Sequence, residues 1–338
     1  MHPEKIRILH DRANMLAKAR QYFSGRGIIE VDCPGLTQEA SVDAHIDLIR
    51  AYRNSSSKAY FLHSSPEYGM KKLLANGMGD IYQLSHVFRD NEHGMKHLSE
   101  FMMAEWYRLH IPFQEMIEET VGFIQQIIGK VPHTKISYRE MFLRYAGFDY
   151  LHASETRLFD FLRAHGVDPQ HCFEEGDKDA PLDSVLVDKN DLLDSILSLL
   201  IVPQLPQERL CVVDSFPATQ AALAQVFYCG EEEEVAERFE IFYKGMELAN
   251  GYHELTNSDE QLERLIKANA ERERLGKDSL PIDHSFIEAL KKGLPDCCGV
   301  SVGFDRLMML RHHKEDIADV VPFSEQSFAC DRALSSIE

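Results

Sequence analysis

The sequence lacks the cysteine patterns that mark a zinc site or a disulfide-bonded secreted domain. Its seven cysteines are scattered over 338 residues without a C-x-x-C pair, and only Cys297 and Cys298 adjoin. Disulfides persist in oxidising compartments, whereas a cytosol keeps thiols reduced. The pattern therefore predicts a cytoplasmic protein with free thiols.

Long apolar segments are also absent from the sequence. No run reaches the ~18 apolar residues that a transmembrane helix needs. The N-terminal stretch "MHPEKIRILHDRANM" has no apolar core of the kind that a signal peptide carries. We therefore expect no membrane partner and no secretion signal.

Basic residues are in short supply relative to acidic ones. The chain has 36 Lys and Arg against 55 Asp and Glu, which gives a formal net charge of −19. Proteins that bind a nucleic-acid backbone do so through many Lys and Arg contacts. This balance argues against nucleic acid as the main partner, although local basic patches stay compatible with it.

The sequence does contain helix and strand signals, without internal repeats or a flexible linker. Helical spacing of apolar residues predicts helices over 4–24, 112–129, 191–202 and 259–276. Extended apolar runs predict strands at 27–34, twice within 80–109, at 209–217, twice within 236–255, and at 298–303 directly before a helix. Because most strands follow one another as hairpins, we expect an antiparallel sheet with helices packed on it, an α+β fold. The prediction is one domain over 1–338, with a mixed helix and loop region around 150–210.

The hairpin predicted within 236–255 carries acidic residues in a largely apolar stretch. If the chain turns at Lys244 and Gly245, Glu240 and Glu247 lie close together on neighbouring strands. Opposed like charges destabilise a sheet unless something neutralises them. A divalent cation such as Mg²⁺ prefers these hard oxygen ligands. The alternative is that both carboxylates lie on a solvated face of the sheet.

A polar loop between two strands offers groups for phosphate. In "FRDNEHGMKHLSEF", Arg89 ends one strand, the turn contains His93, Lys96 and His97, and Phe101 lies on the next strand. An arginine can hold a phosphate through two parallel hydrogen bonds, and an aromatic ring can stack on a base. Arginine is common in hairpin loops, so a surface turn is the alternative.

The stretch "GVSVGFDRL" places Val300 and Val302 on one face of a strand and small residues on the other. Small residues on a strand face often mark close approach by a ligand or another backbone. Arg306 follows in the first turn of a helix, where a cation opposes the helix dipole and needs a partner such as phosphate. Asp305 or a neighbouring acid is the alternative partner.

Together and in this order, these three segments resemble motifs 2 and 3 of class II aminoacyl-tRNA synthetases. The segment "GIIEVDCPGL", which contains Pro34, resembles motif 1, the dimer-interface segment. The detail is similar to the lysyl branch, through "SPEYGMKKLL", "RFEIFYKGMELANGYHEL" and "GVSVGFDRLMML", and covers nearly the whole chain. The resemblance implies the class II catalytic fold, a mainly antiparallel sheet flanked by helices, and a homodimer.

Within that branch the chain resembles the elongation factor P–(R)-β-lysine ligase family. Motif 1 lies close to the start of the chain, so we expect no anticodon-binding OB domain, and "EWYR", "HELT" and "PDCCGV" are similar to that family. The resemblance implies ATP-dependent activation of (R)-β-lysine or lysine. Transfer would follow to a lysine side chain of elongation factor P, the expected partner in place of tRNA.

The resemblance also implies roles in binding ATP and Mg²⁺. The catalytic pair would be Arg89, on the α-phosphate and the amino-acid carboxylate, and Arg306, which sandwiches the adenine with Phe101 and reaches the γ-phosphate. Glu240 and Glu247 would hold Mg²⁺. The other matching positions in the ATP site are Asp90, Asn91, His97, Leu98, Leu248 and Gly303.

For the amino acid, the resemblance implies a pocket for two amino groups. Glu254, Glu105 and Tyr107 would surround the terminal ammonium, while Glu67 and Ser65 would take the other amino group. The remaining positions implied for this pocket are Pro66 and Asn250. A buried carboxylate without a partner is costly, so such a pocket selects a cation over a neutral chain.

The chain departs from the family pattern in two places: the loop "FRDNEHGMKHLSEF", called the phosphate loop below, and the strand within "GVSVGFDRL". Asn91 stands where a glutamate normally accepts from the adenine amino group, and Leu98 stands where an asparagine lies near ATP. Ser301 stands where lysyl-tRNA synthetases have glycine, which favours the ligase family. A minimal lysyl-tRNA synthetase and a catalytically impaired paralogue with a binding or regulatory role are the competing hypotheses.

Overall fold

The computed structural model describes residues 2–54, 58–168, 188–230 and 233–324. The chain divides into two compact units, each described by itself. The first comprises Met1–Lys130 and Gly251–Glu338, and the second comprises Val131–Asn250. Strand β11 (Met246–His253) runs along the chain from the second unit into the first. Whether both units act as one catalytic domain stays a prediction.

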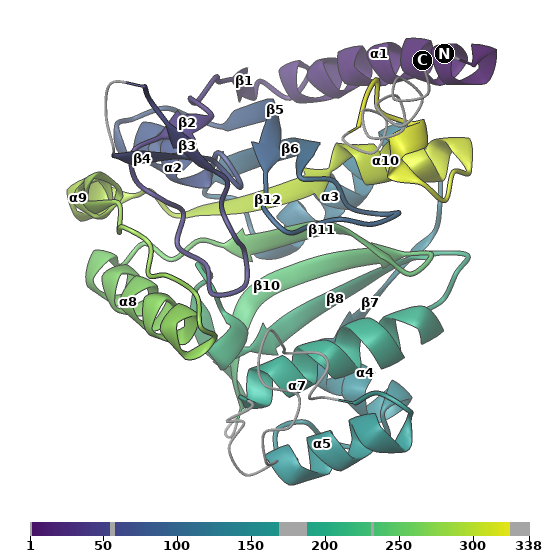
Figure 1. Ribbon diagram of the computed structural model, residues 1–338, viewed down its shortest axis with the longest axis vertical. Coiled ribbons are helices and arrows are strands. Elements are labelled where there is room, and N and C mark those ends of the chain that lie inside the picture. The colour runs from purple at the N-terminus through teal and green to yellow at the C-terminus, as the bar shows by residue number, and fades with distance from the viewer. Residues whose placement is uncertain (1, 55–57, 169–187, 231–232, 325–338) are drawn as a thin grey trace, which may run out of the picture. The chain divides into compact units, whose positions relative to one another are not determined.

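The first unit is built on a mainly antiparallel sheet (Figure 1). Its strands, in spatial order, are β1 (Ile29–Glu30), β5 (Ile81–Phe88), β6 (Glu100–Leu109) and β12 (Cys297–Gly303). The β5–β6 and β6–β12 pairs are antiparallel, and the short β1 pairs with β5 in parallel. A separate small antiparallel sheet contains β2 (Leu36–Thr37), β4 (Ala59–Leu62) and β3 (Arg50–Tyr52).

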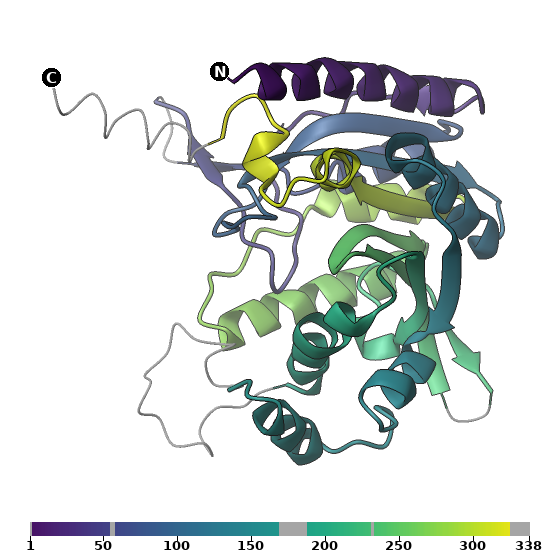
Figure 2. The same cartoon turned by 90° about the vertical axis from the view of Figure 1, so that its right-hand side faces the viewer.

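Helices pack on this sheet through an aromatic core. They are α1 (Pro3–Ser24), α2 (Glu67–Ala75), α3 (Phe113–Ile128), α8 (Ser258–Arg274), α9 (His284–Gly293), α10 (Phe304–His312) and the short η5 (Ile317–Asp319). Figure 1 and Figure 2 both show α1, in purple, running beside β5. Phe23 of α1 stacks on Tyr82 of β5 and contacts Trp106 and Phe123. Burial of such large rings contributes strongly to the stability of this unit.

The second unit also combines strands and helices. Its strands are β7 (His133–Ser137), β8 (Leu210–Pro217), β9 (Val226–Cys229), β10 (Glu233–Tyr243) and the first part of β11. Its helical segments are α4 (Tyr138–Tyr145), α5 (Glu155–Ala164), α7 (Lys189–Ser195), η2 (Ile196–Ile201), η3 (Val202–Gln204) and η4 (Ala218–Gln220). β10 pairs antiparallel with β8 and β9, β7 pairs in parallel with β8, and Tyr138, Phe142 and Phe216 form an aromatic core.

The structure confirms the α+β fold and most of the predicted elements. The carboxylate hairpin turns at Lys244 and Gly245, whose positive φ angles of 50° and 67° match the two-residue turns that join twisted strands. The two strands within 80–109 form a hairpin, and β12 leads directly into α10. None of the described helices is long and apolar enough to cross a membrane.

Three local predictions were wrong. The strand expected over 27–34 is regular only at Ile29–Glu30, because the following residues leave the β5 edge toward the small sheet. The helix expected over 191–202 is an α-helix only to Ser195 and then widens to a π-helix. Pairing is less local than expected, since β6 pairs with β12. Sequence periodicity specifies a strand but not its distant partner.

Candidate active site

Three carboxylates are brought together in the first unit by separate elements. Glu67 lies in the first turn of α2, directly after Pro66, where the helix dipole favours an anion. Glu105 lies in the middle of β6, and Glu254 follows β11. Glu105 is 3% exposed and Glu254 only 1%, so neither is a solvated surface acid.

Hydroxyl groups connect the predicted amine-binding residues into one network. Ser65 Oγ donates to Glu105 Oε2 at 2.7 Å, and the Tyr107 hydroxyl donates to Glu105 Oε1 at 2.8 Å. Ser65 Oγ also accepts from the Glu67 amide at 3.0 Å. The two groups of residues that the resemblance implied for two separate amino groups therefore form one continuous polar cluster.

The cluster contains a lysine that the sequence reasoning missed. Lys71 is fully buried, and its Nζ lies 2.6 Å from Glu67 Oε1 and 2.5 Å from Glu254 Oε2. A signal was present, because Glu67 and Lys71 have the i, i+4 spacing of a helical ion pair. The lysine also follows the buried Met70 and precedes the buried Leu74, which indicates an inward-facing position.

Burial shifts the protonation of these groups. Desolvation, followed by the Glu67 carboxylate, raises the pKa of Glu105 to about 8. Desolvation also raises the pKa of Glu254, to about 7, although the Lys71 ammonium opposes that shift. Burial disfavours the charged form of Lys71, but Glu254 and Glu67 outweigh it and hold the pKa of the ammonium above its usual value.

Gly299 forms one wall of the cluster. A Cβ atom at this position would lie 2.3 Å from Glu254 Oε1 and 2.3 Å from Tyr107 Cε1, much closer than real contacts allow. The glycine on this strand face is therefore required by close approach of side chains. Ser301, two residues along β12, is the direct cross-strand neighbour of Glu105. The position at which this chain departs from the lysyl pattern therefore lies beside the carboxylate cluster.

Two arginines predicted to bind ATP lie in the first unit. The Arg89 guanidinium lies 5.2 Å from the centre of the Phe101 ring, and its buried Nε has no hydrogen-bond partner among the described residues. Arg306 Nη2 contacts His97 Nε2 at 2.8 Å, and its Nε donates to the Lys96 carbonyl at 3.4 Å. The structure therefore joins the phosphate loop to the first turn of α10.

Asp305, which was one alternative partner for Arg306, is paired elsewhere. Asp305 lies 2.5 Å from Arg12 of α1 and accepts from the Met102 amide at 2.8 Å. Asp305 is 2% exposed, and its two contacts link α10 to α1 and β6. Arg306 points instead toward the loop that contains His97.

The departure at Asn91 has a structural role in the phosphate loop. Asn91 adopts a left-handed backbone conformation, with φ 60°, and its side chain hydrogen-bonds to the Asp47 carboxylate. The adjacent Asp90 amide donates to the Asp47 carbonyl at 2.8 Å. Asp47 is held in turn by Arg272 of α8, at 3.1 Å, and by Lys277, at 3.1 Å. Asparagine tolerates this conformation better than most residues.

The second unit contains the predicted metal ligands. Glu240 is 6% exposed, which excludes the solvated-face alternative for this residue, while Glu247 is half-buried. Glu240 Oε1 lies 2.5 Å from Arg238 Nη2. Burial raises the pKa of Glu240 to about 8, with Arg238 opposing and Glu247 reinforcing that shift. Two carboxylates that interact electrostatically in this way fit Mg²⁺, because that ion takes few protein ligands besides substrate phosphates.

The other predicted residues are distributed over both units. Leu98 and Leu248 are buried, Gly303 and Asn250 are half-buried, and Asp90 is exposed. The atoms nearest to a Cβ at Gly303 would belong to the Arg306 side chain, at 3.7 Å or more, so close packing does not require this glycine. No group of three or more His, Cys, Asp or Glu suited to a metal occurs in the described part of the chain.

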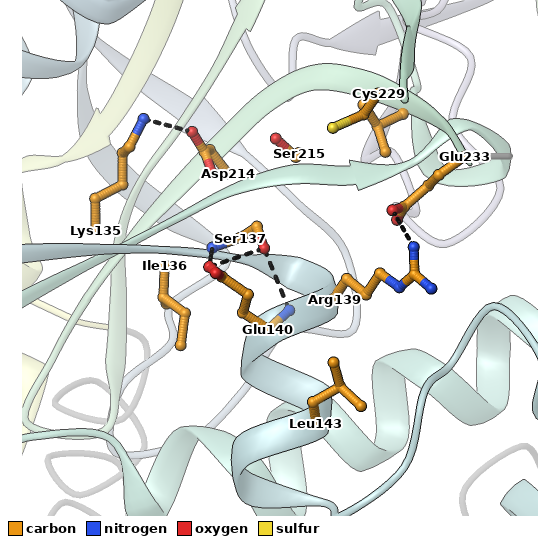
Figure 3. A pocket seen from close by; sticks show the side chains of 11 residues that line it. Lys135, Ile136, Ser137, Arg139, Glu140, Leu143, Asp214, Ser215, Cys229 and Glu233 are labelled. Carbon is orange, nitrogen blue, oxygen red and sulfur yellow. Dashed lines mark hydrogen bonds and ion pairs between the residues drawn. The ribbon is translucent and has the colours of Figure 1, made fainter. Parts of the chain in front are cut away.

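The second unit also contains a cavity of about 400 Å³ that none of the predicted residues lines (Figure 3). Its cationic side chains are paired, Lys135 with Asp214 at 3.0 Å and Arg139 with Glu233 at 3.0 Å. Figure 3 shows these two pairs on opposite sides of the cavity. We therefore retain the carboxylate cluster and the two arginines as the candidate active site.

Comparison with known proteins agrees with this fold. The family model of class II tRNA synthetases (D, K and N) matches residues 1–327. The chain therefore belongs to the class II tRNA synthetase family. A protein of Haemophilus influenzae named elongation factor P–(R)-beta-lysine ligase is 41% identical over 93% of both chains. Proteins of the same name from Avibacterium paragallinarum and Pasteurella multocida are each 39% identical, covering 94% and 92% of this chain and 95% and 93% of their own.

Proposed function

We propose that this protein is an ATP-dependent ligase that activates (R)-β-lysine and transfers it to a lysine side chain of elongation factor P. The observation that carries the proposal is the buried cluster of Glu67, Glu105 and Glu254 in a class II synthetase fold. Such a cluster suits a substrate with ammonium groups. The names of its relatives indicate which diamino acid and which acceptor to test first.

The reaction has two steps. The substrate carboxylate attacks the α-phosphorus of ATP and pyrophosphate leaves, which produces an aminoacyl-adenylate. The acceptor amine then attacks the acyl carbon and AMP leaves. Little covalent chemistry falls to the protein, so catalysis depends on positioning and on stabilising charge on the phosphate oxygens.

The first unit supplies the positioning groups. Arg89, with a buried Nε that has no partner among the described residues, would bind the α-phosphate and the substrate carboxylate. Phe101 and Arg306 would hold the adenine, and His97, whose Nε2 accepts from Arg306 Nη2, would orient that guanidinium. The polar cluster that contains Glu105 would bind the two amino groups, which orients the carboxylate toward the arginine.

Mg²⁺ is the metal that the carboxylates of the second unit fit best. Glu240 and Glu247 would hold it, with Arg238 keeping the buried Glu240 carboxylate oriented. When bound, the ion would neutralise charge on the nucleotide phosphates. Leu248, on the same strand as Glu247, would contact the nucleotide, and Asn250 would contact the amino acid.

Two further properties belong to this proposal. The protein would act in the cytoplasm, supported by the free thiols of Cys33, Cys211, Cys229, Cys297 and Cys298. It would act as a homodimer through the segment around Pro34. Both inferences suit an enzyme of translation that modifies another cytoplasmic protein.

The decisive experiment compares acceptors. The enzyme is incubated with Mg-ATP and labelled (R)-β-lysine, and separately with labelled lysine, in the presence of either elongation factor P or total tRNA. We expect β-lysine label on the protein and none on tRNA. Label on tRNA alone would establish a minimal lysyl-tRNA synthetase, and the absence of ATP–pyrophosphate exchange with either amino acid would establish a non-catalytic paralogue.

A further inference from the structure

The carboxylate cluster of the first unit, formed by Glu67, Glu105 and Glu254, contains an ammonium group of its own. Lys71 lies one helical turn after Glu67, and its side chain is 0% exposed. Its Nζ lies within hydrogen-bond distance of two carboxylates, Glu67 Oε1 and Glu254 Oε2. Fully buried lysines are rare because desolvation of the ammonium is costly. The neighbouring carboxylates must therefore compensate that cost.

The charges in the cluster can be counted. Its acidic members are Glu67, Glu105 and Glu254, and its basic member is Lys71, so with all of them ionised the net charge is −2. Other titratable groups of the described structure that interact with these side chains are Tyr107, Tyr68, Cys33, Cys297 and His253. A net charge of −2 matches a substrate with two ammonium groups. Without Lys71 the carboxylates would exceed those ammonium groups by one.

We propose that Lys71 is a positioning residue that fixes Glu67 and Glu254 for a substrate with two ammonium groups. The identity of that substrate rests on the proposed function. Each carboxylate places one oxygen on the Lys71 ammonium, which fixes the orientation of both side chains. Gly299 lets Glu254 Oε1 pack directly against the β12 backbone, since any Cβ there would collide with that atom.

Two effects of removing Lys71 oppose each other. If the lysine only screened charge, its loss would strengthen the attraction between the carboxylates and a cationic substrate. If the lysine positions the carboxylates, its loss lets Glu67 and Glu254 repel each other or take up a proton, and binding weakens. The direction of the change in affinity therefore separates positioning from screening.

The test is binding of L-lysine to the full chain, measured by calorimetry without ATP. The variant Lys71→Gln keeps an N–H donor but removes the charge. We expect it to weaken lysine binding about tenfold or more, because a buried group that contacts the ligand loses the partner that orients it. The KM for ATP should stay unchanged. Unchanged or tighter lysine binding would overturn the proposal.

The matched control is Lys72→Gln on the same helix. Lys72 also forms an ion pair with a buried carboxylate, that of Asp283, but it contacts none of the three cluster carboxylates in the described structure. This variant should lose stability without losing lysine affinity. A parallel loss of affinity in both variants would show a general effect of destabilising α2 and would contradict a specific role for Lys71.

A measurement on the wild-type protein does not depend on the folding of a variant. Burial and Glu67 raise the pKa of Glu105 to about 8, so we expect the empty cluster to hold about one proton at neutral pH, chiefly on Glu105. Arrival of two ammonium groups should release about one proton at pH 7, seen as a dependence of the binding heat on the ionisation enthalpy of the buffer. Absence of proton release would contradict the charge balance.

Ligands that lack one amino group complete the test. Norleucine lacks the terminal ammonium and 6-aminohexanoate lacks the α-ammonium, so each should bind wild type more weakly than lysine. Equal affinity for all three would overturn the requirement for two ammonium groups. Because these assays need no turnover, normal lysine binding without adenylate formation would contradict the proposed function alone.

Discussion

Glu105 is one of three buried carboxyls, with Glu240 and Glu254, whose protonation should contribute to the pH dependence of stability. The pKa of the Glu105 carboxyl is raised from 4.5 to about 8 in the folded chain, chiefly by desolvation. A raised pKa means that the folded state binds a proton which the unfolded state has lost, so stability is full below pH 4.5 and falls as pH rises through 8.

Replacing Glu105 by glutamine should therefore stabilise the substrate-free protein at high pH. We expect Glu105→Gln to increase the free energy of unfolding at pH 8 by at least about 1 kcal/mol, with little change at pH 4.5. Urea unfolding at both pH values measures the difference. An equal effect at the two pH values would show that Glu105 is already ionised in the empty cluster.

Gly299 should not tolerate a methyl group. A Cβ would lie 2.3 Å from both Glu254 Oε1 and Tyr107 Cε1, and overpacking of this kind costs about 1–3 kcal/mol. We expect Gly299→Ala to lower the unfolding free energy and to raise the KM for lysine.

The control for that variant lies on the same strand. Gly303→Ala adds a methyl group whose nearest neighbours, at ordinary distances, are atoms of the flexible Arg306 side chain, so stability should be kept. Its effect should fall on the KM for ATP. If Gly303→Ala also destabilised the protein, the contrast between the two glycines would be wrong.

At the scale of elements, the phosphate loop is fixed to α8 through the segment around Asp47. Arg272 is 4% exposed and donates to the carbonyls of Asp43 and Ile46 at 2.9 Å, which holds this segment on the helix. Asp47 then contacts the loop through Asp90 and Asn91. The order of the loop that contains Arg89 thus depends on a buried arginine distant in sequence.

This arrangement predicts coupling between Asp47 and Asn91. Asn91→Asp would place two carboxylates together, so the KM for ATP should rise several-fold, while adding Asp47→Asn should recover part of the loss. A double-mutant cycle should give a coupling of about 0.5–3 kcal/mol, the range for residues in contact. Additive effects would show that the contact does not order the loop, and Asn91→Ala provides the uncharged control.

At the scale of the whole molecule, an exposed apolar segment predicts self-association. Ile29 and Leu36, on either side of Pro34, are 50% and 43% exposed in the single chain. Apolar side chains exposed on a short edge segment are typical of interfaces. We expect light scattering to give a dimer mass at micromolar concentration and Ile29→Lys to shift it to the monomer. A monomer mass for wild type would contradict the homodimer.

The sequence by itself determined the family and most of the elements, and it supplied the candidate residues. Local patterns sufficed for this, because an amphipathic helix, a hairpin turn at Lys244–Gly245 and a strand that leads into a helix are encoded within a few residues. Motif spacing then identified Arg89, Glu247, Glu254 and Arg306, whose roles remain predictions.

Only the tertiary structure decided what surrounds those residues. The burial of Lys71 between Glu67 and Glu254, the wall at Gly299 and the contact between Asp47 and Asn91 all join segments that are distant in sequence. Long-range packing sets these contacts, and a one-dimensional pattern specifies which face of an element is apolar but not which element covers it. Burial also fixes the protonation of the cluster, because desolvation depends on every neighbouring element together.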